Sequence, residues 1–202
     1  MPEIITSFEQ GSPEWNQARI GSLGGSSIGK AVAKGEGKVR KQLLHDMVGE
    51  ILSGEKKDGF HSINMDAGVA YEDSARSLYA FRMDVEVEQI AMFRDGPHKH
   101  ASPDGCVGAE GLIEIKTVIP SVFVESKLTG KIPTAHRKQM QWGLKRSGRG
   151  YCDYAVFCPY VKDIDPLLII RLTRDEKEIA ELESGADEFI DEMLEMVDRM
   201  RQ

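Results

Sequence analysis

The sequence predicts an α/β fold in which helices cover both faces of a central mixed β-sheet. Two kinds of segment support this prediction. Apolar residues recur at helical spacing over residues 38–52, 64–81, 133–147 and 174–200. Short apolar or alternating runs at 112–117, 151–158 and 167–172 have the length and composition of β-strands.

The size and composition of the chain suit a single domain. With 202 residues, of which 41% are hydrophobic, the chain can enclose a sizeable core, and we expect one domain over residues 1–202. No apolar run approaches the ~20 residues that cross a bilayer, and no signal peptide is evident, so we expect a cytoplasmic protein without membrane contact. The three cysteines form no Cys-x-x-Cys pair, which favours buried thiols over a disulfide framework, a zinc ribbon or an iron–sulfur cluster.

The N-terminal segment predicts a short helix followed by a glycine-rich loop. Ser12 and Pro13 form a helix start, and we expect a helix over residues 15–20 that ends at Gly21. The loop then leads into a second small helix. Backbone N–H groups at such a helix start can bind an anion, and Arg19 lies one turn upstream. A flexible turn without a ligand is the alternative.

Two longer helices should follow. The helix over residues 38–52 is amphipathic, and the helix over residues 64–81 carries Glu72 near its apolar face. The sequence leaves Glu72 with two interpretations: an exposed surface residue, or a carboxylate directed into a site. Antiparallel strands are then expected at 85–93 and 98–101, on either side of an Asp95-Gly96 turn.

Residues 102–117, Ser-Pro-Asp-Gly-Cys-Val-Gly-Ala-Glu-Gly-Leu-Ile-Glu-Ile-Lys-Thr, contain the most specific functional signal. The proline and glycines predict a tight turn around Asp104, and the alternation after it predicts a strand with Glu114 and Lys116 on one face. These three groups should therefore meet. Asp104 and Glu114 offer oxygen ligands for a hard divalent cation, and Lys116 can orient water or stabilise charge on phosphorus, as in a metal-dependent nuclease.

A Glu-x-Lys pattern alone is weak evidence, because it begins at four positions: Glu36, Glu55, Glu114 and Glu125. Three of these lie in loops or in the helix expected after Pro120, where solvated surface charges are the simpler interpretation. Only Glu114 lies in an apolar strand beside a Pro-Asp-Gly turn. A surface ion pair between Glu114 and Lys116 is the alternative to a catalytic role.

Charge is distributed unevenly along the chain. The net charge is −7, and residues 173–202, with eleven acidic and four basic residues, account for the whole excess. Residues 120–150 instead contain one acid and seven basic residues, which are Lys127, Lys131, Arg137, Lys138, Lys145, Arg146 and Arg149. This basic stretch predicts a surface for a phosphate backbone, with a solvated helix face as the alternative. The acidic helix over residues 174–200 should pack its apolar side on the sheet or on a neighbouring subunit.

The order of these features resembles the PD-(D/E)XK nuclease superfamily, and within it the lambda-exonuclease-like, YqaJ-type viral recombinase family of alkaline exonucleases. The resemblance covers nearly the whole chain. Its most specific part is Ser-Pro-Asp-Gly at 102–105 with Glu-Ile-Lys at 114–116. Further matches are Trp-Asn-Gln-Ala-Arg-Ile-Gly at 15–21 followed by Ser26, Gly-Val-Ala-Tyr-Glu at 68–72, and His-Arg-Lys-Gln-Met-Gln at 136–141. His136 stands where some relatives have tyrosine, which leaves its role open.

The resemblance implies a Mg²⁺-dependent 5′→3′ exonuclease that releases 5′-mononucleotides from linear duplex DNA and leaves 3′ single-stranded overhangs for recombination. It implies that two Mg²⁺ ions, replaceable by Mn²⁺, bind to the following groups: Asp104, Glu114, the carbonyl of Ile115, and Glu72. Lys116 would position the attacking water and help to deprotonate it. Gln139 would orient water or phosphate.

The resemblance also implies a site for the end of the DNA. Arg19, Ser26 and Ser102 would bind the terminal 5′ phosphate, and His136 and Arg137 would contact DNA. Members of the family form ring-shaped homotrimers and act with a single-strand annealing protein. Two other functions remain open: a site-specific restriction endonuclease on the same core, and a non-catalytic DNA-binding protein.

Overall fold

A computed structural model of the chain describes residues 2–33, 37–56 and 63–202, with side chains from residue 71 onward in the last range. Its elements in chain order are β1 (Glu3–Ile5), α1 (Pro13–Ala18), α2 (Gly25–Ala31), α3 (Lys38–Ser53), α4 (Ile63–Met83), β2 (Val87–Glu88), β3 (Met92–Arg94), β4 (His100–Ala101), β5 (Gly105–Val107), β6 (Gly111–Thr117), α5 (Pro120–Thr129), α6 (Thr134–Ser147), β7 (Tyr151–Phe157), β8 (Leu167–Thr173) and α7 (Glu176–Met200).

The central sheet has five strands in the order β2-β5-β6-β7-β8. β6 pairs with β7 in parallel, and every other neighbouring pair is antiparallel. The sheet is therefore mixed, as predicted. β1, β3 and β4 form a separate three-stranded antiparallel sheet.

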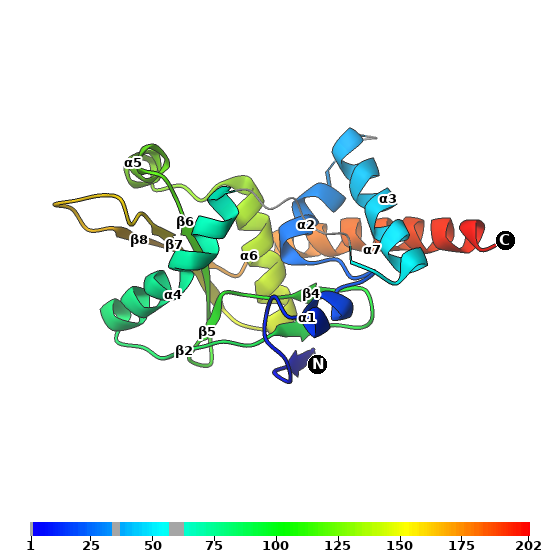
Figure 1. Ribbon diagram of the computed structural model, residues 1–202, viewed down its shortest axis with the longest axis horizontal. Coiled ribbons are helices and arrows are strands. Elements are labelled where there is room, and N and C mark those ends of the chain that lie inside the picture. Colours follow the sequence, from blue (N-terminus) through cyan, green and yellow to red (C-terminus); the bar gives the residue numbers. More distant parts are fainter. Residues whose placement is uncertain (1, 34–36, 57–62) are drawn as a thin grey trace.

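Side-chain alternation along β6 separates two apolar layers. Leu112 packs on one face, in a cluster with Met140 and Leu144 of α6 and Phe123 of α5. Ile113 and Ile115 pack on the opposite face, with Ala75 and Tyr79 of α4. Figure 1 shows α4 crossing one side of the strands, with α6 between the sheet and the helices α2, α3 and α7. The predicted arrangement of helices on both faces is confirmed.

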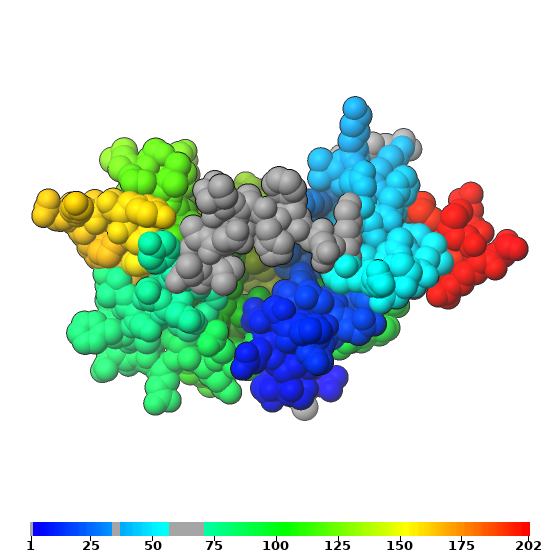
Figure 2. Space-filling model, in the orientation of Figure 1, coloured from blue at the N-terminus to red at the C-terminus, as the bar shows by residue number. Residues whose placement is uncertain are grey.

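A third apolar cluster lies away from the sheet. It joins α2, α3 and α7 through residues that include Ile28, Leu44 and Phe189, and Trp142 of α6 belongs to it. The Trp142 indole Nε1 also donates a hydrogen bond of 2.8 Å to the carbonyl of His100 in β4. α6 thus links the sheet to the helical part of the molecule. The last turns of α7 project beyond the other elements (Figures 1 and 2).

Most of the expected helices and strands agree with the structure to within a few residues. The segment at 85–93 differs, because it contributes two short strands to two different sheets. β2 pairs with β5 in the central sheet, whereas β3 pairs with β1 and β4. Long-range pairing decides this division, and the local alternation of residues does not encode it. The side chains of the Gly68–Ala70 match and the loop at 57–61 lie outside the described residues.

The basic stretch at 120–150 does not form one exposed cationic surface, and that prediction was wrong for Arg146. Arg146 is fully buried and pairs with Asp95, at 2.5 Å, and with Glu183 of α7. Arg137 pairs with Glu178 of α7 at 2.7 Å. Several acids of the C-terminal helix therefore neutralise cations within the fold.

Two further expectations concern the state of the cysteines and membrane-spanning helices. Cys106, Cys152 and Cys158 are free and buried, as expected for small apolar side chains. None of the helices in the described ranges is long and apolar enough to cross a membrane.

We predict that Arg146→Ala lowers the free energy of unfolding by about 3 kcal/mol, because it leaves a cavity and unpairs two carboxylates. The Arg146 guanidinium also lies 4.4 Å from the centre of the Trp142 ring, and this contact is lost as well. Urea denaturation measures the change. Lys145→Ala, at the neighbouring and partly exposed position, is the matched control and should change the value by less than about 0.5 kcal/mol. Equal effects of the two substitutions would contradict the prediction.

Candidate active site

The hairpin of β5 and β6 brings the predicted metal-binding carboxylates together. Gly105 lies opposite Ile113 in the antiparallel register, so Asp104 reaches the Glu114–Ile115 part of β6. The Asp104 carboxylate accepts a hydrogen bond of 2.6 Å from the Ile115 N–H. A Cβ atom at Gly105 would lie only 2.3 Å from Val87 of β2. The close pairing of these strands therefore requires glycine after Asp104.

The carboxylates of Asp104 and Glu114 lie close together in a partly buried environment, and this changes the pKa values in the cluster. Burial raises the pKa of Asp104 well above its usual range, and the neighbouring Glu114 carboxylate raises it further. Glu114 is buried, and its carboxylate accepts a hydrogen bond of 2.5 Å from the Lys116 ammonium. Burial alone would lower the pKa of Lys116, but the charges of Glu114 and Asp104 outweigh it and raise that pKa. Lys116 is therefore a cation that donates hydrogen bonds.

Glu72 of α4 faces the same cluster. Its carboxylate pairs with Arg76, one turn along the helix, and Arg76 also donates a hydrogen bond of 2.9 Å to the carbonyl of Asp104. Burial raises the pKa of Glu72, and the charge of Asp104 adds to that effect, while Arg76 and Lys116 oppose it. Glu72 is thus partly buried and paired with Arg76, near the charges of Asp104 and Lys116, and its role at the site stays a prediction.

These groups suit a hard divalent cation. Asp104, Glu114 and the carbonyl of Ile115 offer oxygen donors, which such ions prefer. The raised pKa of Asp104 is the supporting observation, because a cation relieves the repulsion between the partly buried Asp104 carboxylate and the buried Glu114 carboxylate. Within the described residues, no group of three or more His, Cys, Asp and Glu side chains is arranged to hold a metal ion by itself. Any such site would therefore also use backbone carbonyls, water or substrate oxygens.

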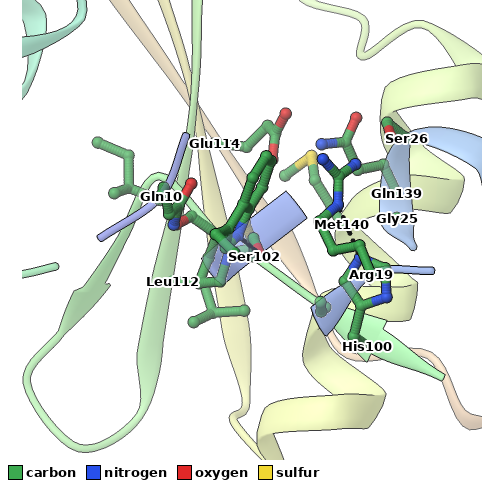
Figure 3. A pocket seen from close by; sticks show the side chains of 16 residues that line it. Gln10, Arg19, Gly25, Ser26, His100, Ser102, Leu112, Glu114, Gln139 and Met140 are labelled. Atoms are coloured by element: carbon green, nitrogen blue, oxygen red, sulfur yellow. Dashed lines mark hydrogen bonds between the residues drawn. The ribbon is translucent and has the colours of Figure 1, made fainter. Parts of the chain in front are cut away.

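A pocket of about 160 Å³ adjoins the carboxylates. It is lined by five of the predicted site residues, which are Arg19, Ser26, Ser102, Glu114 and Gln139. Figure 3 shows the polar ends of Arg19, Gln139 and Glu114 gathered at one end of it. Residues that lie far apart in the sequence thus share one cavity.

Two contacts of Trp15 organise the pocket wall. The Arg19 guanidinium lies 3.8 Å from the centre of the Trp15 ring. The indole Nε1 donates a hydrogen bond of 3.1 Å to the Ser102 hydroxyl oxygen. Because that oxygen accepts from the indole, the Ser102 O–H proton is left to donate elsewhere.

The start of α2 lies close to α6 and to β4. Ser26 is exposed in the first turn of α2, which Gly24 caps. A Cβ atom at Gly25 would lie 3.1 Å from the Gln139 side chain, and one at Gly24 would lie 2.6 Å from His100 Nε2. The two glycines therefore allow the close approach that places Ser26 beside Gln139.

The remaining predicted residues lie in different surroundings. His136 stacks on Tyr154 of β7, with 5.5 Å between the ring centres. Burial and the charge of Lys116 lower the pKa of His136, while a hydrogen bond with Gln139 raises it, so His136 lies beside both residues. Arg137 is held by Glu178 and does not line the pocket.

Sequence reasoning missed two residues of this site. Tyr154 lies opposite Glu114 in the parallel register, inside an apolar run that gave no functional signal. His100, the second, contacts Arg19 from β4. Its position two residues before the Ser-Pro-Asp-Gly motif was the one available hint.

The fold and this site together define a class of protein, the nucleases with a PD-(D/E)XK core. Residues 14–150 match the YqaJ-like viral recombinase domain, and the chain therefore belongs to that family. None of the curated proteins compared with the chain matches it.

Solved structures agree with this assignment. The chain is similar to an alkaline exonuclease (LHK-Exo) from Laribacter hongkongensis, with 28% identity, coverage of 94% of this chain and 96% of that chain, and a TM-score of 0.87. The complex of LHK-Exo with dAMP gives the same identity and coverage and a TM-score of 0.88. A phage-related exonuclease from Haemophilus somnus 129PT shares 13% identity over 89% of this chain and 96% of that chain, with a TM-score of 0.69, which shows a common fold.

We predict that Gly24→Ala lowers the melting temperature by several degrees, because the added methyl group would displace His100. Thermal unfolding followed by circular dichroism measures the shift. Gly37→Ala is the matched control: Gly37 also caps a helix with an extended backbone, and a Cβ atom there meets nothing within 4 Å. A shift of the same size in the control would contradict this explanation.

A second prediction concerns acid stability. Burial and the nearby charges of Arg19, Lys56 and Arg94 lower the pKa of His100 from 6.5 to about 3. The unfolded chain therefore binds one more proton at this residue between these pH values, so the His100 contribution to stability falls as pH drops from 6.5 toward 3.

The free energy of unfolding of the wild-type protein should accordingly change more steeply with pH than that of the His100→Gln variant, by up to about 1.4 kcal/mol per pH unit. Urea titrations at pH 7, 6, 5 and 4 compare the two proteins. Carboxylates contribute alike to both curves, so parallel curves would show that His100 is not protonated on unfolding.

Proposed function

We propose that this chain is a Mg²⁺-dependent exonuclease that degrades the 5′-ended strand of linear duplex DNA and leaves 3′ single-stranded overhangs. One observation carries the proposal: the pocket that contains Arg19, Ser26 and Ser102 opens directly onto Glu114 and Gln139. An enzyme that cuts at a chain end has to bind that end beside its reaction centre. An endonuclease has no such requirement.

The pocket suits a terminal phosphate. A guanidinium and two hydroxyl groups provide charge-assisted and neutral hydrogen bonds to phosphate oxygens. Stacking on Trp15 orients Arg19, and the indole hydrogen bond leaves the Ser102 O–H free to donate. The first turn of α2 adds the Ser26 hydroxyl. A phosphate bound there would fix which phosphodiester lies over the carboxylates.

Asp104, Glu114, the carbonyl of Ile115 and Glu72 would hold Mg²⁺, as two ions, and Mn²⁺ is the expected substitute. A metal held by these residues would supply charge stabilisation for the attacking and leaving oxygens of a phosphodiester displacement. The combined negative charge of these carboxylates also explains why the cations of Lys116 and Arg76 lie beside them.

The side chains around the carboxylates would position the attacking water, the phosphate and the DNA. Lys116, whose ammonium lies 2.5 Å from the Glu114 carboxylate, donates a hydrogen bond to the attacking water or to a phosphate oxygen. Gln139 orients the water or the phosphate. His136, packed on Tyr154 beside Lys116, borders the path of the DNA.

The relatives support this assignment. LHK-Exo is an alkaline exonuclease crystallised in complex with dAMP, a nucleoside monophosphate of the kind that exonucleases release. Membership of a viral recombinase family fits a role in recombination with a single-strand annealing protein. A homotrimeric ring fits continuous degradation of a DNA end. Light scattering tests this last point, and a monomer mass would exclude the ring.

Digestion of linear duplex DNA, labelled separately at its 5′ and 3′ ends, tests the activity. We expect Mg²⁺-dependent release of 5′-labelled mononucleotide first, faster from 5′-phosphate than from 5′-hydroxyl ends, and no cutting of closed circles. Lys116→Ala should lower the rate at least about 100-fold, because it removes a charge next to the reacting phosphate. Lys162→Ala, in the exposed loop between β7 and β8, is the matched control and should keep the full rate.

Other outcomes separate the alternatives. Nicks in the closed circle would indicate a restriction-type endonuclease on the same core. Early release of the 3′ label would keep the metal site but reverse the polarity. DNA binding without product in either Mg²⁺ or Mn²⁺ would indicate a non-catalytic DNA-binding protein.

A further inference from the structure

His100 of β4 is a buried polar residue in contact with the proposed phosphate ligand. The residue is only 3% exposed. Arg19 Nε donates a hydrogen bond of 3.3 Å to His100 Nε2, and His100 Nδ1 lies 2.8 Å from the Ser22 hydroxyl (Figure 3 shows the first contact). His100 therefore sits between the loop before α2 and the arginine of the pocket.

The chemistry of these contacts fixes the protonation state of the ring. A guanidinium can only donate, so Nε2 must accept and carries no proton. The proton of the neutral ring is then on Nδ1, and it is donated to Ser22. Three cations face the imidazole: Arg19, Lys56 and Arg94. They oppose a second proton on the ring, as burial does.

This arrangement determines which part of Arg19 faces the pocket. Nε is bound by His100, and one face of the guanidinium lies on Trp15. Both contacts restrict rotation of a long side chain that would otherwise lose considerable entropy on binding a ligand. The N–H groups of the two terminal nitrogens are thereby available to a phosphate.

We infer that His100 is a positioning residue that orients Arg19 for the terminal 5′ phosphate, and so sets the preference of the enzyme for phosphorylated DNA ends. This inference rests on the proposed function. It assigns to His100 a role in end recognition that packing alone does not require, because an apolar ring of the same shape would fill the same space.

Two substitutions separate positioning from packing. His100→Phe keeps a ring against Gly24 but cannot accept a hydrogen bond from Arg19. His100→Gln provides a carbonyl oxygen that can replace Nε2 as the acceptor. The readout is the ratio of kcat/KM on 5′-phosphate ends to kcat/KM on 5′-hydroxyl ends, and a purely structural defect would lower both values together.

We expect the ratio to fall about tenfold in His100→Phe, chiefly through KM on phosphorylated ends, and to stay within about threefold of the parent value in His100→Gln. Arg19→Ala should abolish the preference. Adding His100→Phe to Arg19→Ala should then change the ratio no further, because the two residues act through one contact.

The outcomes are distinct. An unchanged ratio in His100→Phe, with the preference lost in Arg19→Ala, would overturn the inference and leave the proposed function intact. A wild-type enzyme without any preference for phosphorylated ends would overturn the phosphate pocket and the inference with it. If His100→Phe does not fold, Ser22→Ala serves instead: it frees the ring from its Nδ1 contact and should lower the same ratio, and an unchanged ratio would again overturn the inference.

Discussion

The structure depends on the close antiparallel pairing of β5 with β6, which holds Asp104 against the backbone of Ile115 and beside Glu114. Two carboxylates near each other in a partly dry place cost free energy, as the raised pKa of Asp104 shows. The fold offsets this cost with Lys116 on the same strand and Arg76 from α4. Stability alone would favour apolar residues at these positions, and the proposed role of the carboxylates in holding a cation gives a reason for their presence.

α6 connects this carboxylate cluster to the pocket. One side of the helix packs on Leu112 of β6, and its Gln139 reaches the space between the carboxylates and Arg19. Further along, Trp142 bonds to the backbone of His100, the residue that holds Arg19. α6 thus contacts both the strand that carries Glu114 and the strand that carries His100, so it helps to fix the position of the carboxylates relative to the Arg19 side of the pocket.

The acidic residues of the C-terminal helix α7 form ion pairs with cations inside the fold, as well as facing solvent. Glu178 neutralises Arg137, and Glu183 neutralises Arg146 and also lies near Lys99. The net negative charge is thus partly the counterpart of cations that the fold buries or half-buries. Net charge alone is accordingly a poor guide to whether this chain binds DNA, and the local composition of the pocket is the better one.

The sequence by itself determined the helices, the central strands and the turn at Asp104, because apolar periodicity and glycine or proline signals act over a few residues. It also predicted that Asp104, Glu114 and Lys116 meet, because they lie within thirteen residues of one another on one hairpin, and the structure confirms this. Only the tertiary structure decided that Arg146 is buried, that residues 85–93 divide between two sheets, and that His100 and Tyr154 belong to the site. Each of these features depends on a partner that is distant in the sequence. Arg146 pairs with Glu183, β2 pairs with β5, His100 contacts Arg19, and Tyr154 stacks on His136. No local pattern specifies such a pairing.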